Sequence, residues 1–308
     1  MRFLRFLVAT VFSLLVTSGF AAPEAEGLVT WFADDTLWSV APDAFMGQHR
    51  AAGFRWLTPA KVSARSVGDD LSFLGLPVHE CVVRFENDAV QGVTLSLYNR
   101  GDVGNRSEEE FTNQVNACIS KLNAWTKVRP TPVQKKSRPP AARIYRQTWN
   151  TANAWFGLTW SFSKRHRKDG EEYPYRAEYV TLQVVSPAAG QASAGGDDDS
   201  RSARGMTKQQ LLAGLVKNDK GDLFIDGIPM VDQGQKGYCA AATAERVLRY
   251  YQAEVDQHEI AQIAESSAQR GTNPDVMFDA LKRVGVKLGV RVKELESFNV
   301  QDFQRLVR

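Results

Sequence analysis

The chain has 308 residues, which is enough for two domains of ordinary size. Hydrophobic residues make up 43% and charged residues 24%, proportions that are normal for a soluble globular protein. The formal net charge is only +3, so we do not expect nucleic acid as a partner, because phosphate binding needs a concentrated basic face.

The N-terminus, residues 1–21, has the pattern of a secretory signal peptide. Two arginines among the first five residues supply positive charge, residues 6–16 are apolar or small, and small residues follow at the cleavage positions. The apolar run is shorter than the roughly 20 residues that a membrane span needs. We expect a mature chain that begins near Ala22, is secreted or periplasmic, and has no stable membrane span. An uncleaved membrane anchor is the alternative.

Residues 23–186 are expected to form an α+β domain built on an antiparallel sheet. Apolar residues alternate with others along two segments, as they do in strands with one buried face. These residues are Cys81, Val83 and Phe85 in the first segment, then Val93, Leu95 and Leu97 in the second. Further strands are expected over residues 143–151, 154–164 and 175–186.

One helix is expected to pack on this sheet. Ser107 and Glu110 have the spacing of a capping box, which marks a helix start. Apolar residues then recur at steps of three and four and make a single stripe. The stripe consists of Phe111, Val115, Cys118, Leu122 and Trp125.

The chain contains three cysteines, at positions 81, 118 and 239. Cys81 and Cys118 both fall on core-facing positions, where they are either buried thiols or a disulfide between the sheet and the helix. An odd count in an oxidising compartment leaves at least one thiol unpaired, and catalysis is one reason to keep such a thiol.

Residues 187–205 contain no large apolar residue. Such a segment buries too little surface to offset the entropy of the chain, so it is expected to be a flexible linker. It separates residues 23–186 from a second part, residues 206–308.

Cys239 is the candidate catalytic residue of the second part. A Gly-containing loop precedes it, and a helix is expected to begin at the cysteine. The buried face of this helix is expected to carry Ala244, Val247, Leu248 and Tyr251. Unpaired backbone N–H groups at a helix N-terminus favour the reactive thiolate over the thiol. The alternative is that the cysteine is a small core residue.

Gln233 lies six residues before the cysteine, and the turn marked by Gly234 and Gly237 can bring its amide beside the sulfur. That amide and the backbone N–H of Cys239 would hold the oxyanion that forms when a thiolate attacks a carbonyl. The pattern therefore favours nucleophilic catalysis by Cys239. No metal-ligand spacing accompanies it, and we expect no cofactor.

Residues 233–239 resemble the Gln-x-x-x-x-x-Cys signature of papain-like cysteine peptidases. The sequence after the cysteine resembles more closely the bacterial branch of this family that is related to bacteriocin-leader-processing enzymes, cysteine peptidase family thirty-nine. The segments with this likeness are residues 244–251, 259–264 and 271–281. The resemblance covers about residues 223–308 and no earlier part of the chain.

The resemblance implies that residues 206–308 form the helical first half of a papain-like domain, with Cys239 as nucleophile and Gln233 as oxyanion donor. Family members also use a His as general base and usually an Asp or Asn that orients it. The only His after the cysteine is His258, which we expect in the first turn of a helix and in solvent. The helices also lack a following sheet to cover their apolar faces, so we expect the domain to be incomplete and the base to lie beyond Arg308.

The leading prediction is an exported cysteine peptidase that hydrolyses peptide bonds in peptide or protein substrates. The alternative is a catalytically incomplete papain-like module that binds peptides or cell-envelope partners. Acyl transfer also stays open, because water and amines attack the same thioester. No residue of the first part forms a recognisable site.

Overall fold

The computed structural model describes most of the chain from residue 26 onward. The described residues are 26–57, 61–138, 142–168, 170–194, 208–231, 233, 237–251, 255, 257–266, 271–287, 291–293, 299 and 301. The predicted signal peptide, residues 1–21, lies outside them. No described helix combines the length and the apolar character that crossing a bilayer requires.

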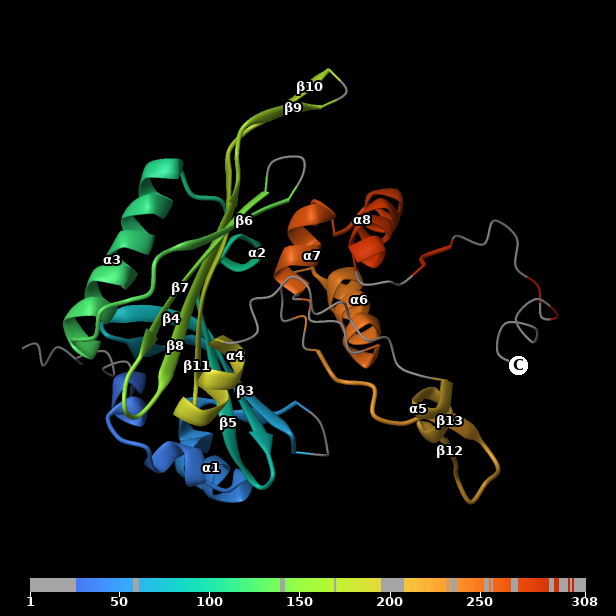
Figure 1. Cartoon of the computed structure of the whole chain (residues 1–308), viewed down its shortest axis with the longest axis horizontal. Helices are drawn as coiled ribbons and strands as arrows, with labels where there is room; N and C mark the ends of the chain where they lie inside the picture. Colours follow the sequence, from blue (N-terminus) through green and yellow to red (C-terminus); the bar gives the residue numbers. More distant parts are fainter. Residues whose placement is uncertain are drawn as a thin grey trace, which may run out of the picture.

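An antiparallel sheet forms the centre of the first part (Figure 1). In the described chain its strands lie in the order β1-β3-β4-β5-β11-β8-β7-β6, with β2 paired to β3 and β1 parallel to β3. The strands are β1 (Glu26–Gly27), β2 (Arg55–Trp56), β3 (Ser63–Phe73), β4 (Leu76–Glu86), β5 (Ala89–Asn99), β6 (Gln134–Arg138), β7 (Ala142–Asn150), β8 (Trp155–Ser163) and β11 (Arg176–Val185). The predicted strands are thus confirmed, with ends that differ by one residue at most positions.

One face of the sheet is apolar and is covered by α3 (Glu108–Thr126). The predicted alternation is confirmed, because Cys81, Val83 and Phe85 of β4 and the matching residues of β5 are buried in one core. The predicted capping box is also present: the Ser107 hydroxyl accepts the backbone N–H of Glu110, whose carboxylate accepts the N–H of Ser107. These local signals position the helix on the sheet.

Cys81 and Cys118 are both buried in this core and do not form a disulfide. Burial raises the pKa of the Cys118 thiol to about 12, because a thiolate loses its hydration in an apolar interior. Of the two readings left open by the sequence, the structure therefore supports buried thiols.

Short elements close the edges of this part. The elements near the start of the described chain pack aromatic side chains, including Phe32 of η1 and Phe45 of α1, onto the same core. The elements are η1 (Leu28–Phe32), η2 (Thr36–Ser39), α1 (Pro42–His49), η3 (Arg50–Ala52), α2 (Arg100–Val103) and the hairpin of β9 (His166–Lys168) and β10 (Glu171–Tyr173). The hairpin extends beyond the sheet at one end (Figure 1).

Part of the predicted flexible linker, residues 187–205, is ordered as a helix. Its first eight residues form α4 (Pro187–Ala194), which packs on β8. Gly190 makes this packing possible, because a Cβ at that position would lie 2.2 Å from Cβ of Trp155. The small residues that indicated a linker serve here as a close-packing surface. Residues 195–205 lie outside the described chain.

In its described residues the second part contains the small hairpin of β12 (Leu215–Lys217) and β13 (Leu223–Ile225) and the helices α5 to α8. The helices are α5 (Lys208–Ala213), α6 (Cys239–Tyr250), α7 (Gln257–Ile263) and α8 (Pro274–Lys287). The described part of the chain thus confirms that a helix begins at Cys239. The sequence also favours a strand over residues 288–292 and a short helix over residues 300–308, and both lie mostly outside the described residues.

The buried face of α6 differs from the prediction at two positions. Ala244 and Leu248 are buried, but Val247 and Tyr251 are 49% and 36% exposed. The face that packs on α7 and α8 is centred instead on Ala241, Ala244 and Leu248. The alanines allow the helices to approach closely, and this contact outweighs burial of the larger side chains on the neighbouring face.

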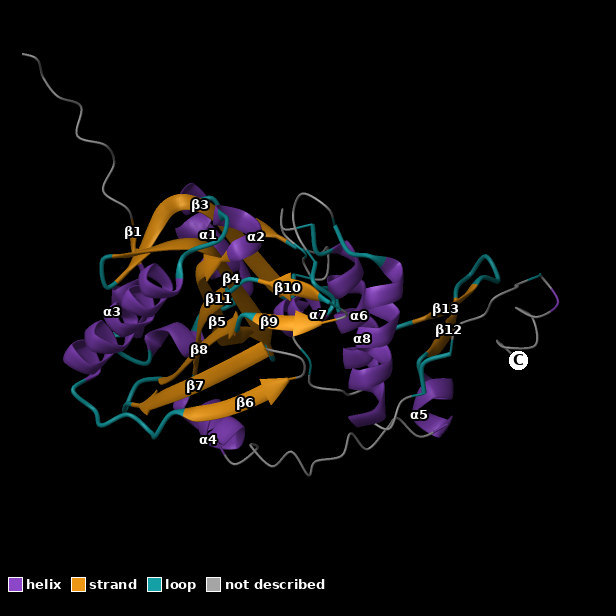
Figure 2. Ribbon diagram, turned by 90° about the horizontal axis from the view of Figure 1, so that it is seen from above, coloured by secondary structure: helices purple, strands orange, loops and turns teal. Residues whose placement is uncertain are grey.

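The helices α6, α7 and α8 lie on the side of the sheet opposite α3 (Figures 1 and 2). They bury a small core against one another, and α7 contacts β11. The three helices therefore partly cover one another's apolar faces, and the expectation that the domain is incomplete stays a prediction. The chain is α+β, with a large antiparallel sheet and several helices, while a papain-like arrangement stays a prediction.

Candidate functional site

Cys239 is the first residue of α6, and its side chain is exposed. Gly237, two residues earlier, has a φ of +68°, which glycine adopts without steric cost and which turns the chain toward the helix. Tyr238 follows with only 3% of its surface exposed, and its carbonyl accepts the backbone N–H of Ala242 at 2.8 Å. The anchored tyrosine therefore fixes the helix start and leaves the thiol at the surface.

Gln233 is exposed as well, on the loop that leads into α6. Among the described residues, no hydrogen bond joins the Cys239 sulfur to Gln233 or to His258. Residues 234–236, which form most of the intervening turn, lie outside the described chain. The roles of Cys239 as nucleophile and Gln233 as oxyanion donor therefore stay predictions.

His258 lies in the first turn of α7, as expected, but it is half-buried and not in solvent. Its Nδ1 is 2.8 Å from Nδ2 of Asn99, at the end of β5. Its ring also lies 5.4 Å from that of Tyr179 and 5.7 Å from that of Tyr238, measured between ring centroids. The expectation of solvent was wrong because α7 packs on the sheet and carries the histidine into the interface.

The contact with Asn99 fixes the protonation pattern of His258. The Asn99 Oδ1 accepts the backbone N–H of Gly101 at 2.7 Å, so the amide NH₂ group faces the imidazole. An NH₂ group can only donate, so Nδ1 accepts, and the neutral ring then carries its proton on Nε2. In this arrangement Nδ1 is occupied by a residue of the sheet and does not act as a base toward Cys239.

Hydrogen bonds between polar groups attach α7 and the residues that follow it to the sheet and to α2. The buried side chain of Gln262 on α7 accepts from the Ser161 hydroxyl at 2.6 Å and donates to the Ser163 hydroxyl at 3.0 Å. Arg100 donates to the backbone carbonyl of Ser266 at 2.7 Å. The position of α7 is therefore specified by directional bonds to β8 and to the start of α2.

A buried carboxylate supports the same interface. Glu178 of β11 is 3% exposed and lies 3.1 Å from the Nε atoms of both Arg100 and Arg176. It also accepts from the Ser163 hydroxyl at 3.0 Å. A buried charge is costly unless it is paired, so the two guanidinium groups and the hydroxyl offset the cost of burying this carboxylate.

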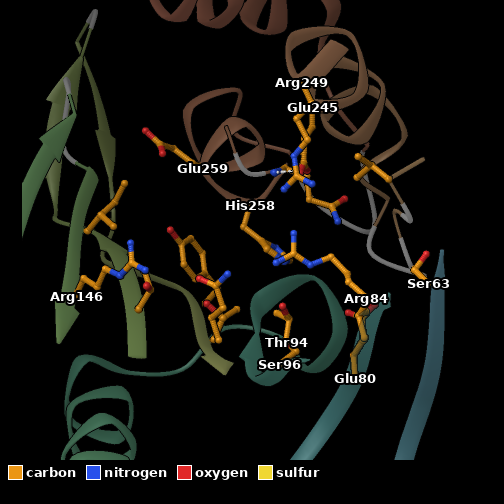
Figure 3. A pocket seen from close by; sticks show the side chains of 18 of the residues that line it. Ser63, Glu80, Arg84, Thr94, Ser96, Arg146, Glu245, Arg249, His258 and Glu259 are labelled. Atoms are coloured by element: carbon orange, nitrogen blue, oxygen red, sulfur yellow. Dashed lines mark hydrogen bonds and ion pairs between the residues drawn. The ribbon is translucent and has the colours of Figure 1, made fainter. Parts of the chain in front are cut away.

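A cavity of about 400 Å³ lies between the helices and the polar face of the sheet (Figure 3). Its floor follows the register of the central strands, where Ser96 of β5 pairs with Thr181 of β11 and Thr181 pairs with Thr159 of β8. Glu80 and Arg146 continue this row on β4 and β7. The helices contribute Glu245, Arg249, Gln257, His258 and Glu259.

Two of the acidic groups in the cavity are neutralised inside the protein. Glu80 lies 2.8 Å from Nε of Arg65. Glu245 lies 2.6 Å from Arg249 on the same helix and also accepts the backbone N–H of Gln257 at 2.7 Å. Neither of the sequence-predicted site residues, Cys239 and Gln233, is among the described residues that line this cavity.

The polar residues that form the floor of this cavity are visible in the sequence as an alternating pattern on two strands. Thr94 and Ser96 alternate with the core residues of β5, and Thr181 and Gln183 do the same on β11. Such residues on the second face of an antiparallel sheet usually indicate solvent. The covering helices come from residues more than fifty positions farther along the chain, so the pattern alone did not reveal a cavity.

Among the described residues, no group of three or more His, Cys, Asp or Glu side chains is placed to hold a metal ion. The arrangement instead offers two separate features, an exposed thiol at a helix start and a polar cavity beside it. No known protein family, curated protein or solved structure matches this chain.

Proposed function

We propose that the chain is an exported thiol-dependent peptidase in which Cys239 attacks the carbonyl carbon of a peptide bond. The observation that supports this proposal is the contrast among the thiols. Cys239 is exposed at the first residue of a 12-residue helix, whereas Cys81 and Cys118 are buried. Nucleophilic thiols need access and a site that favours negative charge, and only the helix start provides both.

In the proposed reaction the Cys239 thiolate adds to the peptide carbonyl and forms a tetrahedral oxyanion. The oxyanion collapses to a thioester as the C–N bond breaks and the amine leaves with a proton taken from solvent. Water then attacks the thioester, which releases the acid and regenerates the thiolate as a proton returns to solvent. Gln233 and the backbone N–H of Cys239 are proposed as the oxyanion donors. Removal of one such donor typically lowers the rate about 10²–10³-fold, so Gln233→Ala should lower kcat by that factor.

The test is labelling of the purified chain with a peptidyl epoxide or another thiol-directed peptidase inhibitor, followed by mapping of the modified residue. We expect modification at Cys239, with Cys118 unmodified in the folded protein. The matched variants are Cys239→Ala, which should abolish both labelling and peptide cleavage, and Cys118→Ala, which should change neither. Peptide cleavage that persists in Cys239→Ala would exclude this mechanism.

A second function is favoured by the position of His258. Its Nδ1 is bonded to Asn99 of the sheet and not directed at the thiol. A module of this kind would bind peptides or cell-envelope partners without cleaving them. Turnover of a peptide library distinguishes the two proposals, because the binding module retains peptides and releases them unchanged.

Export is part of the same proposal and has its own test. The predicted signal peptide implies that the mature protein begins near Ala22. N-terminal sequencing of protein recovered from the periplasm or culture medium should find that start. Recovery of the intact N-terminus from the cytoplasm would contradict it and would leave the proposed role of Cys239 unaffected.

A further inference from the structure

The cavity between the sheet and the helices is lined by an arginine, Arg84, that no carboxylate of the described residues contacts directly. Within the part of the chain that the structure describes, Arg84 forms no ion pair, in contrast to Arg65 and Arg249, which pair with carboxylates. Figure 3 shows the Arg84 side chain extending from the sheet toward His258 and the helices. Loss of hydration and then the positive charge of Arg249 lower the pKa of its guanidinium, while the carboxylates of Glu86 and Glu245 act in the opposite direction.

The position of Arg84 is built into the sheet. Its cross-strand partner on β5 is Gly92, and a Cβ at that glycine would lie 3.4 Å from a guanidinium nitrogen. The guanidinium therefore lies over Gly92, where no side chain stands between it and the strand. Arg84 is exposed and lines the cavity, so its donors can reach a molecule that enters.

A second and independent observation comes from the floor of the cavity. Ser96 is only 4% exposed, and among the described residues its hydroxyl has no hydrogen-bond partner. A buried hydroxyl without a partner destabilises the fold unless something in the cavity satisfies it. Thr94 and Thr181 line the cavity beside it, so the floor presents a group of hydroxyls.

We propose that this cavity binds a small polar molecule that carries one carboxylate group. The guanidinium of Arg84 receives the carboxylate, since its paired N–H donors match the two oxygens. The hydroxyls of Ser96, Thr94 and Thr181 receive the polar body of the ligand. The volume of about 400 Å³ falls within the range of roughly 300–1,000 Å³ that small-molecule sites occupy.

The charges favour a carboxylate over a phosphate. The first backbone N–H of α7 and the guanidinium of Arg249 are both already bonded to Glu245. Among the described arginines that line the cavity, Arg84 is then the one that forms neither an ion pair nor an aromatic contact, because Arg146 lies over the ring of Trp155. One positive charge balances a carboxylate but not a phosphate dianion.

The test uses the full chain and a matched pair of probes in a calorimetric titration, N-acetyl-alanyl-alanine and its C-terminal amide. We expect the acid to bind at least tenfold more tightly than the amide. Arg84→Gln should weaken binding of the acid by about 10- to 100-fold, the usual effect of losing a charge-assisted hydrogen bond. Arg84→Lys, which keeps the charge but not the paired donors, should have an intermediate effect. Arg167→Gln on the exposed β9–β10 hairpin is the control and should change nothing.

Equal affinity for the acid and the amide would overturn the proposal, as would an affinity for the acid that Arg84→Gln does not change. Failure of both probes to bind at millimolar concentration would overturn it too. Inorganic phosphate serves as a third probe, and tighter binding of phosphate that depends on Arg84 would refute the assignment to a carboxylate. Cys239→Ala should bind the acid like the natural chain, so this site and the proposed thiol chemistry succeed or fail separately. Unfolding curves of each variant confirm that it is folded.

Discussion

Gln262 offers a direct test of how the helices are attached to the sheet. Its side chain is 4% exposed and forms two hydrogen bonds, to the hydroxyls of Ser161 and Ser163 on β8. Gln262→Leu removes both bonds with little change in volume. We expect this substitution to destabilise the docked arrangement of α7 without unfolding the sheet.

The size of this destabilisation follows from the hydrogen-bond partners that Ser161 and Ser163 retain in the substituted protein. In the substituted protein the single Ser161 proton, which reaches either Gln262 or the carbonyl of Arg143, is donated to that carbonyl at 3.0 Å, and Ser163 still donates to Glu178 at 3.0 Å. Neither hydroxyl is left without a partner, so only the two bonds themselves are lost. At about 0.5–1.5 kcal/mol for each bond, the expected loss is about 1–3 kcal/mol.

Hydrogen exchange with mass spectrometry measures this loss locally. Amides of α7 should exchange about 5- to 150-fold faster in Gln262→Leu, while those in the core of β4 and β5 should be unchanged. Gln48→Leu, at an exposed position of α1, is the matched control and should alter stability by no more than about 0.5 kcal/mol. Exchange of α7 at the natural rate in Gln262→Leu would refute docking through these bonds.

The remaining predictions concern packing, capping and pH. Gly190→Ala should lower the free energy of unfolding by about 1–3 kcal/mol, because the added Cβ would overlap Trp155. Gly47→Ala, in the open interior of α1, should raise it by about 0.5–1 kcal/mol, and thermal unfolding measures both changes. Ser107→Ala should cost about 0.5–2 kcal/mol by removing the cap of α3, and urea denaturation measures it. Burial raises the pKa of Tyr238 to about 12, so the folded chain keeps a proton that the unfolded chain loses above pH of about 10. Stability should therefore fall as the pH rises from about 10 to 12, and Tyr238→Phe should reduce that slope.

Elements set by local patterns could be predicted from the sequence. The helix α3 was predicted from its capping box and its apolar stripe, because both signals lie within one segment. The start of α6 at Cys239 was predicted from the glycine-containing turn before it. These features depend on neighbours within a few residues, where backbone geometry and side-chain spacing decide the outcome.

Features that depend on distant partners could not be predicted. His258 was expected in solvent, yet its partner Asn99 lies 159 residues earlier in the chain. The buried face of α6 was misjudged at Val247, because the sequence does not show that α7 prefers the alanine face. The helix α4 was missed since small residues predict flexibility unless a surface such as Trp155 is present to receive them.

The polar interface and the cavity are two consequences of one arrangement. The floor of the cavity belongs to the sheet, and its opposite wall belongs to α6 and α7, so the cavity exists only while the helices are docked. A molecule that occupies it must then stabilise docking by an amount set by its concentration relative to its Kd. Each hydrogen bond of Gln262 is weak enough that α7 can separate from β8, and its direction is specific enough that the helix returns to the same position. An interface of this kind, unlike an apolar one, leaves the docked state open to control by whatever binds Arg84.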